Sequence, residues 1–93
     1  MLMPVHPGRI LASEIEARGL TPHALALKLR VPANRIGAII AGTRGISADT
    51  ALRLGHYLGT GPELWMRLQA DYDLALAEKT SGPKVRDEVN VAA

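Results

Sequence analysis

Proline and glycine residues divide this chain of 93 residues into short segments in which leucine, isoleucine and alanine recur at helical spacing. Proline suits the first position of a helix, because its missing N–H would have no partner there. Glycine accepts the left-handed conformation that commonly ends a helix. Long alternating runs of β-branched and aromatic residues, which favour strands, are missing from the sequence. These helix start and stop signals, together with the missing strand pattern, predict an all-α fold.

Five helices follow from these start and stop signals. Thr21 and Ser47 are suited to accept hydrogen bonds from the first free N–H groups of the second and fourth helices. Thr60 and Glu63 have the spacing of a capping box for the fifth helix. The expected helices span residues 7–18, 22–29, 32–41, 48–58 and about 61–78.

The C-terminal residues lack the apolar pattern that packs a helix into a domain. Thr80, Ser81, Gly82 and Pro83 are followed by a charged stretch with scattered valines. The burial of so few apolar groups does not offset the entropy lost on ordering the chain. We therefore expect one domain over residues 1–79 and a mobile tail over residues 80–93.

Composition excludes several classes of protein. The chain contains no Cys, which excludes disulfides, thiolate catalysis and Cys-ligated metal sites. It contains no Phe, one Trp and two Tyr, so the core must be aliphatic. No apolar run approaches the roughly 20 residues of a membrane span, and the first residues lack a signal pattern. We expect a cytoplasmic protein that does not enter a membrane.

Neither a catalytic site nor a metal site is expected. His6, His23 and His56 lie too far apart in the sequence for local chelation, and no recognised metal motif surrounds them. We assign His6 to capping the first helix. Acidic pairs such as Glu14 and Glu16 fall on different faces of a helix, which does not suit paired acid–base chemistry. The sequence thus predicts no enzyme activity, no cofactor and no small-molecule substrate.

Positive charge is concentrated in the first part of the chain. Residues 1–60 carry a net charge of +4, whereas residues 61–93 carry a net charge of −2. No acidic residue occurs between Glu16 and Asp49. Such an unopposed positive field suits an anionic partner, and a basic surface kept for solubility is the alternative. The basic residues in this stretch are Arg18, Lys28, Arg30, Arg35 and Arg44.

A helix, a tight corner and a second short helix within this basic stretch are the elements of a helix-turn-helix DNA reader. The third expected helix would enter the major groove, which admits a single helix, so its outward side chains should be small or polar. With Ile36, Ile39 and Ile40 turned inward at about 100° per residue, Asn34 and Ala38 point outward. The third helix therefore has the side-chain pattern of a recognition helix.

Asn34 is the first candidate for base reading, because an Asn amide can pair with adenine through both N6 and N7. Ala33 and Ala38 can contact thymine methyl groups, or can simply favour the helix. Arg35 lies off the outward direction. A base contact, a phosphate contact and pairing within the domain all remain open for this residue.

Two residues that follow the third helix are candidate phosphate contacts. Thr43 offers a hydroxyl group and Arg44 a guanidinium group, next to the exposed backbone of the helix end. Such groups can hold phosphate without reading sequence. An ordinary polar loop is the alternative interpretation.

The apolar side of the fifth expected helix is a candidate subunit interface. One short recognition helix makes few base contacts, whereas two copies about 34 Å apart can read a palindrome on one face of a duplex. The alternative is that the whole stripe packs within one chain. The candidate residues are Trp65, Leu68, Tyr72 and Leu76.

Several motifs together resemble a known family. Residues 21–42 fit, without a gap, the pattern of the Cro/C1-type (XRE) helix-turn-helix domains. The segments 6–8, 44–54 and 62–65 narrow the resemblance to HigA-type antitoxins, and the likeness extends from about His6 to Leu76. The positions that carry the XRE pattern are Thr21, Leu25, Ala26, Leu29, Val31, Ile36, Ile39 and Gly42.

The resemblance implies a five-helix, lambda repressor-like fold and a homodimeric autorepressor that binds double-stranded DNA at a palindromic operator. It also implies an antitoxin that sequesters a HigB-type toxin, a small mRNA-cleaving ribonuclease of RelE-like fold. A stand-alone repressor without a toxin and a mainly protein-binding module with weak DNA binding are the alternatives.

Two positions depart from the family pattern. Many members carry a phosphate-binding glutamine at the start of the second helix, where this chain has Pro22, which has no donor. Thr21 and His23 are therefore the candidates for that phosphate contact. Many members carry glycine at the corner, where this chain has Arg30. Since a non-Gly residue in a left-handed turn costs about 1 kcal/mol, we expect a corner of different shape.

Overall fold

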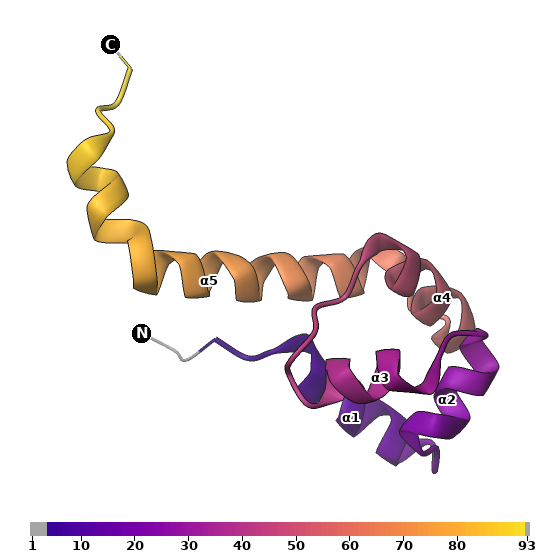
Figure 1. Cartoon of the computed structure of the whole chain (residues 1–93). Coiled ribbons are helices and arrows are strands. Elements are labelled where there is room, and N and C mark those ends of the chain that lie inside the picture. Colours follow the sequence, from indigo (N-terminus) through magenta and orange to yellow (C-terminus); the bar gives the residue numbers. More distant parts are fainter. Residues whose placement is uncertain (1–3, 93) are drawn as a thin grey trace.

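The computed structural model describes residues 4–92, and the regular structure of this part of the chain consists of five α-helices. Figure 1 shows α1–α4 gathered into a globular end, from which α5 extends. The dimensions of 51 × 22 × 21 Å reflect this projecting helix. The all-α prediction is confirmed. The helices are α1 (Pro7–Ala17), α2 (Pro22–Leu29), α3 (Ala33–Ile40), α4 (Ala48–Leu58) and α5 (Pro62–Glu88).

Side chains cap the first turns of α1, α2 and α4. The Nδ1 atom of His6 accepts a hydrogen bond from the backbone N–H of Gly8 at 2.9 Å, which confirms its expected capping role. The Oγ1 atom of Thr21 accepts one from Ala24 N–H at 3.0 Å. Ser47 likewise caps α4. Each contact satisfies a donor that has no partner within its own helix, so the sequence signals for these helix starts were correct.

One aliphatic core holds the globular end together. All five helices contribute to it, and Ile46 contributes from the loop between α3 and α4. Trp65 is the single aromatic member of this core. Because these side chains interlock around α3, the position of that helix is set by α1 and α2, against which it packs. The core residues are Leu11, Ile15, Leu25, Ala26, Leu29, Ile36, Ile39, Ile46, Ala51, Leu54, Leu58 and Trp65.

Gly55 allows α4 and α5 to meet closely. A Cβ atom at this position would overlap the backbone of Gly61 and Pro62 at the start of α5. The backbone N–H of Gly61 donates a hydrogen bond to the carbonyl of Gly55 at 3.2 Å. Gly55 therefore marks a tight contact between these two helices.

The start of α5 differs from the predicted capping box. Gly61 occupies the N-cap, and no side chain caps the helix. The hydroxyl oxygen of Thr60 instead accepts a hydrogen bond from Nε1 of Trp65 at 2.9 Å. The prediction was wrong because the buried indole N–H needs an acceptor and Thr60 supplies it.

Helix α5 continues to Glu88, well beyond its expected end near Glu78. Gly82 and Pro83 were expected to lie in the tail, yet both lie inside the helix. Figure 1 shows the helix changing direction where its colour passes from orange to yellow, close to these residues. A proline removes one backbone donor and collides with the preceding turn, which bends a helix without always ending it. The expected end of the fifth helix near Glu78 was therefore wrong, and the expected mobility of residues 80–93 stays a prediction.

None of the helices in the described part of the chain is long and apolar enough to cross a membrane.

Candidate nucleic-acid interface

The corner between α2 and α3 has the left-handed turn of a standard helix-turn-helix unit. Arg30 ends α2 with φ 59° and ψ 46°, and it is the one non-Gly residue at positive φ among residues 4–92. The backbone N–H of Val31 donates to the carbonyl of Ala26 at 3.1 Å and closes the turn. The expectation of a differently shaped corner was wrong, since the surrounding contacts hold Arg30 in the strained conformation.

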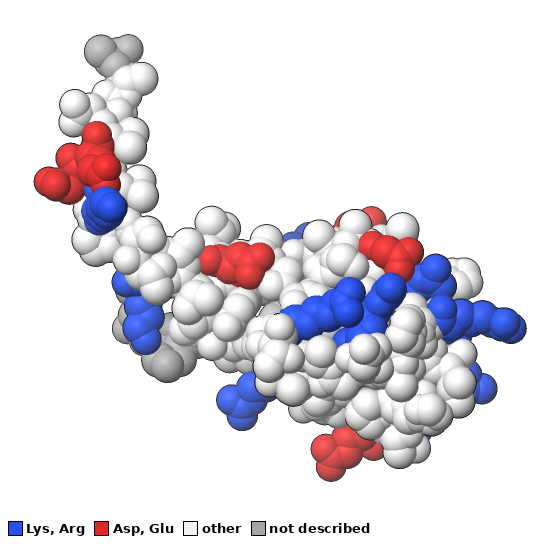
Figure 2. Space-filling model, in the orientation of Figure 1, with Lys and Arg blue, Asp and Glu red and all other residues white. Residues whose placement is uncertain are grey.

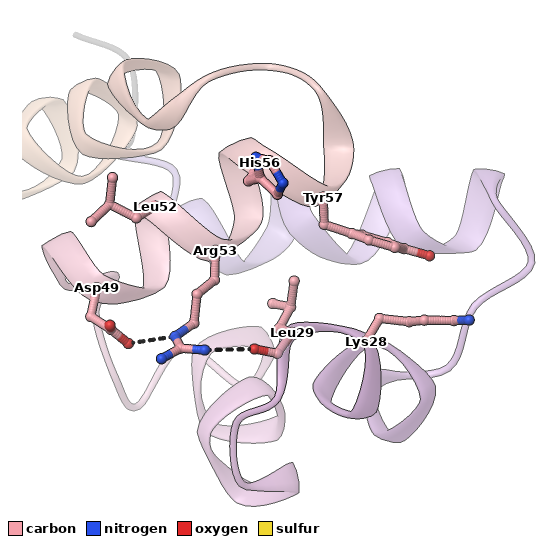
Figure 3. Close-up of a pocket in the computed structure, with 7 residues that line it drawn as sticks. All are labelled: Lys28, Leu29, Asp49, Leu52, Arg53, His56 and Tyr57. Atoms are coloured by element: carbon pink, nitrogen blue, oxygen red, sulfur yellow. Dashed lines mark hydrogen bonds and ion pairs between the residues drawn. The ribbon is translucent and has the colours of Figure 1, made fainter.

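An arginine from α4 stabilises this corner from the side. The guanidinium of Arg53 donates to the carbonyl oxygen of Leu29 at 3.0 Å, and its Nε donates to the Asp49 carboxylate at 3.0 Å (Figure 3). The carbonyl of Leu29 belongs to the last residue of α2 and lacks a helical partner. Arg53 therefore joins α4 to the end of α2.

The same carboxylate holds α3. The Nη1 atom of Arg35 donates to Asp49 at 2.9 Å, so Asp49 bridges Arg35 and Arg53. The hydrogen bond from Arg53 holds the pKa of the Asp49 carboxyl below its ordinary value of 3.8; the bond from Arg35 acts in the same direction and burial acts against both. This cluster of Arg35, Asp49 and Arg53, which we call the arginine clasp, ties together α2, α3 and α4.

The arginine clasp changes the interpretation of Arg35. Its side chain is only 24% exposed, and its Nε is buried without a hydrogen-bond partner among the described residues. Of the three roles left open for Arg35, pairing within the domain is the one that this geometry supports. Its inclusion among the base-reading candidates finds no support here, because the guanidinium is already held by Asp49.

The outward side of α3 carries the remaining base-reading candidates. Ile36 and Ile39 are buried, while Asn34 and Ala33 are exposed near the start of the helix. Ala38, one turn further on, is half-buried. The isoleucines are thus turned into the core, as a recognition helix requires, and the N-terminal turn presents the Asn34 amide to solvent.

The four candidate phosphate contacts differ in availability. Thr21 and His23 are both exposed at the start of α2, where Thr21 still has its hydroxyl proton to donate. The Thr43 hydroxyl donates to the carbonyl of Ala38 at 3.2 Å, and so does its backbone N–H at 3.0 Å. Both donors of Thr43 are therefore engaged within the chain, which argues against the phosphate contact expected of them. Arg44 is exposed in the loop after α3.

Several basic side chains lie on the globular end, which contains this surface. Figure 2 shows Lys and Arg side chains there beside a few acidic ones, and both signs of charge also lie toward the far end of α5. The positive field predicted from the sequence is therefore displayed by the part of the molecule that contains α3. A field of this kind attracts a polyanion and raises its rate of encounter.

The candidate interface residues on α5 fall into two groups. Trp65 is 1% exposed and belongs to the core of the single chain, so its inclusion in a subunit interface was wrong. Leu68 and Tyr72 are half-buried, and Leu76 is 41% exposed. The Tyr72 ring meets the His6 ring edge-to-face, with centroids 4.9 Å apart. The apolar side of α5 is therefore buried within the single chain at Trp65, and its exposure increases toward Leu76.

Comparisons with known proteins agree with this geometry. The family described as helix-turn-helix matches residues 11–65. The solved structure of an addiction module antidote protein of the HigA family from Coxiella burnetii is 46% identical, with a TM-score of 0.94 over 98% of this chain and 100% of that one. The Pseudomonas aeruginosa antitoxin HigA, solved with the higBA promoter, is 41% identical, with a TM-score of 0.93 over 97% of this chain and 99% of that one. This chain belongs to the HigA-type helix-turn-helix family.

A curated relative extends the same likeness. Virulence-associated protein I of Dichelobacter nodosus is 47% identical over 76 residues, which make up 81% of the HigA-type chain and 70% of that protein. The region shared with this relative and with the two solved structures includes the helix-turn-helix unit described above.

Sequence reasoning missed two contacts that shape the surface of the HigA-type chain. Arg53 was not singled out, although its spacing of four residues from Asp49 on one helix is a recognisable pairing signal. Gln69 on α5 was also missed; its Oε1 accepts a hydrogen bond from the backbone N–H of Ile46 at 2.7 Å. No short sequence pattern predicts that contact, because its two partners are 23 residues apart.

Proposed function

We propose that this chain is a sequence-specific transcriptional autorepressor and antitoxin, which acts in the cytoplasm by binding its own operator and a HigB-type toxin. The observation that carries the DNA-binding part is the placement of α3. Ile36 and Ile39 are buried, the Asn34 amide is exposed in the first turn, and Arg44 is exposed just beyond the end of α3. These groups have the chemistry for base reading and for phosphate binding respectively.

The proposed reader is a homodimer. A single α3 offers few base contacts, and a second copy would read the other half of a palindromic operator. The projecting part of α5 supplies the surface for this pairing: Tyr72 and Leu76 are partly free, and Leu74 is 70% exposed. An α-helix with this much unpartnered apolar surface favours association with another helix.

The antitoxin role is supported by the relatives. The Coxiella burnetii protein is described as an addiction module antidote, and the Pseudomonas aeruginosa protein as an antitoxin. High identity over nearly the full length of both chains favours the same role here. The proposed toxin partner is a small HigB-type ribonuclease, and this chain contributes binding, with no catalytic step of its own.

Operator binding and toxin binding are tested separately. Fluorescence anisotropy with a palindromic fragment of the chain's own promoter and with a random duplex, at about 150 mM salt, measures specificity. We expect the palindrome to bind at least about 10³-fold more tightly. Equal affinity for both duplexes would refute the repressor role and leave a protein-binding module.

Co-expression with the neighbouring reading frame tests the antitoxin role. We expect that frame to encode a basic protein that arrests growth alone and co-purifies with this chain. A chain that binds its operator but neither binds nor neutralises such a protein is a stand-alone repressor.

A further inference from the structure

The loop that joins α3 to α4 is anchored at both of its ends. At its start, the backbone N–H and the hydroxyl of Thr43 both donate to the carbonyl of Ala38. At its end, Ile46 is 3% exposed and its N–H donates to Oε1 of Gln69 at 2.7 Å. Arg44 lies between these two anchors with its side chain exposed. The direction of Arg44 therefore depends on both.

The second anchor comes from α5 and is itself held in place. The Nε2 atom of Gln69 donates to the Asp73 carboxylate, one turn further along the helix, at 2.9 Å. This second bond fixes which end of the carboxamide faces the loop. A Cβ atom at Gly45 would lie 3.1 Å from the Cδ, Nε2 and Oε1 atoms of Gln69. The carboxamide thus lies against Gly45 and bonds to Ile46, the two residues that follow Arg44.

We propose that Gln69 is a positioning residue for the DNA contact of Arg44. Its carboxamide holds the backbone after Arg44, so that the guanidinium is presented to a phosphate beside the end of α3. This inference rests on the proposed function. It also makes operator affinity depend on α5, since any shift of α5 at Gln69 moves the loop that carries Arg44.

The test removes the hydrogen bond from Ile46 to Gln69 and determines whether the resulting loss of operator affinity depends on Arg44. Gln69→Leu keeps the approximate volume and loses both hydrogen bonds. We expect operator affinity to fall roughly threefold to tenfold, the range that one net hydrogen bond corresponds to. The slope of log affinity against log salt should fall by about 1, as it does when one phosphate contact is lost. A variant that lost only stability would keep its salt slope when measured well below its Tm.

A double-mutant cycle with Arg44→Ala distinguishes positioning from a general effect. In the Arg44→Ala background, Gln69→Leu should cause no further loss of affinity. The pair Gln69→Glu with Asp73→Asn exchanges amide and carboxylate, keeps the acceptor for Ile46 and should restore affinity to within about twofold of the wild type. The exchange leaves the net charge unchanged, and Asp73→Asn alone, which keeps an acceptor oxygen for Nε2 of Gln69, is the reference for the loss of that carboxylate.

Gly45→Ala provides a second route if Gln69→Leu does not fold. The added methyl group would push the carboxamide aside while leaving the core unchanged, and it should reduce the salt slope in the same way. Fully additive losses in the cycle, or an unchanged salt slope in both variants, would overturn the inference while the wild type still prefers its operator. A wild-type chain without that preference would overturn the proposed function and this inference with it.

Discussion

The guanidinium of Arg53 donates a hydrogen bond to the carbonyl oxygen of Leu29, the last residue of α2, at 3.0 Å. This contact satisfies a helix-end carbonyl at the point where Arg30 adopts φ 59°. The helix-turn-helix corner therefore keeps its left-handed turn without glycine, with support from a side chain of α4. The strain at Arg30 remains in the folded protein and can be measured.

Arg30→Gly should raise the free energy of unfolding by up to about 1 kcal/mol. Glycine removes the cost of the left-handed conformation, which exceeds the additional entropy that it gives to the unfolded chain. Arg30→Ala loses the same charge and keeps the strain, so it is the matched control. Urea unfolding of both variants measures the difference. Equal stabilities of Arg30→Gly and Arg30→Ala would show that the turn is not strained.

The arginine clasp should make stability depend on acidity. The pKa of Asp49 is lowered in the folded protein, so the ionised carboxylate contributes stability above its ordinary value of 3.8. That contribution disappears as the pH falls through the lowered pKa of the folded state. Asp49→Asn should therefore destabilise the protein at about pH 7 and converge with the wild type in acid.

Unfolding by urea at a series of pH values from about 7 to about 2 measures this convergence. Asp71→Asn, which changes an exposed carboxylate outside the clasp, is the control. A constant difference between Asp49→Asn and the wild type across the series would contradict the role of the ionised carboxylate.

Trp65→Phe should weaken the monomer and leave subunit pairing unchanged. The indole is buried in the core and donates to Thr60, so its replacement leaves a cavity and removes that bond. The expected loss is about 1–3 kcal/mol in the free energy of unfolding. Analytical ultracentrifugation at temperatures where the variant is folded should give the wild-type dimer dissociation constant. A large increase in the dimer dissociation constant would indicate that Trp65 contributes to the interface.

Leu76→Glu should weaken subunit pairing and leave the monomer folded. Leu76 is 41% exposed on the projecting part of α5, so the carboxylate remains solvated in the monomer and is buried only on pairing. We expect the dimer dissociation constant to rise at least tenfold and the monomer to keep its helical circular dichroism. Val91→Glu, beyond the end of α5, is the matched control. An unchanged dimer would exclude this face as the interface.

The starts of α1, α2 and α4 could be read from the sequence because their signals are local. Pro7 and Pro22 stand at the first positions of α1 and α2, and Thr21 caps α2 through a residue three positions away. The end of α5 could not be read in the same way, because Gly82 and Pro83, residue types that commonly follow the end of a helix, lie inside α5 without ending it.

The part of the candidate interface that depends only on which side chains are buried could be predicted from the sequence. The period of the isoleucines placed Asn34 on the outside of α3. The pairing of Arg35 with Asp49 and the hydrogen bond from Ile46 to Gln69 depend on partners from α4 and α5. Such contacts are fixed by tertiary packing, so no spacing along the chain reveals them.

Operator binding by Asn34→Ala is the measurement that decides whether α3 reads bases. We expect a loss of about 1–3 kcal/mol on the palindromic operator and little change on a random duplex. Arg44→Ala should weaken binding to both duplexes similarly and reduce the salt slope by about 1. Equal losses on operator and random DNA for Asn34→Ala, or no loss on either, would contradict the assignment of α3 as the recognition helix.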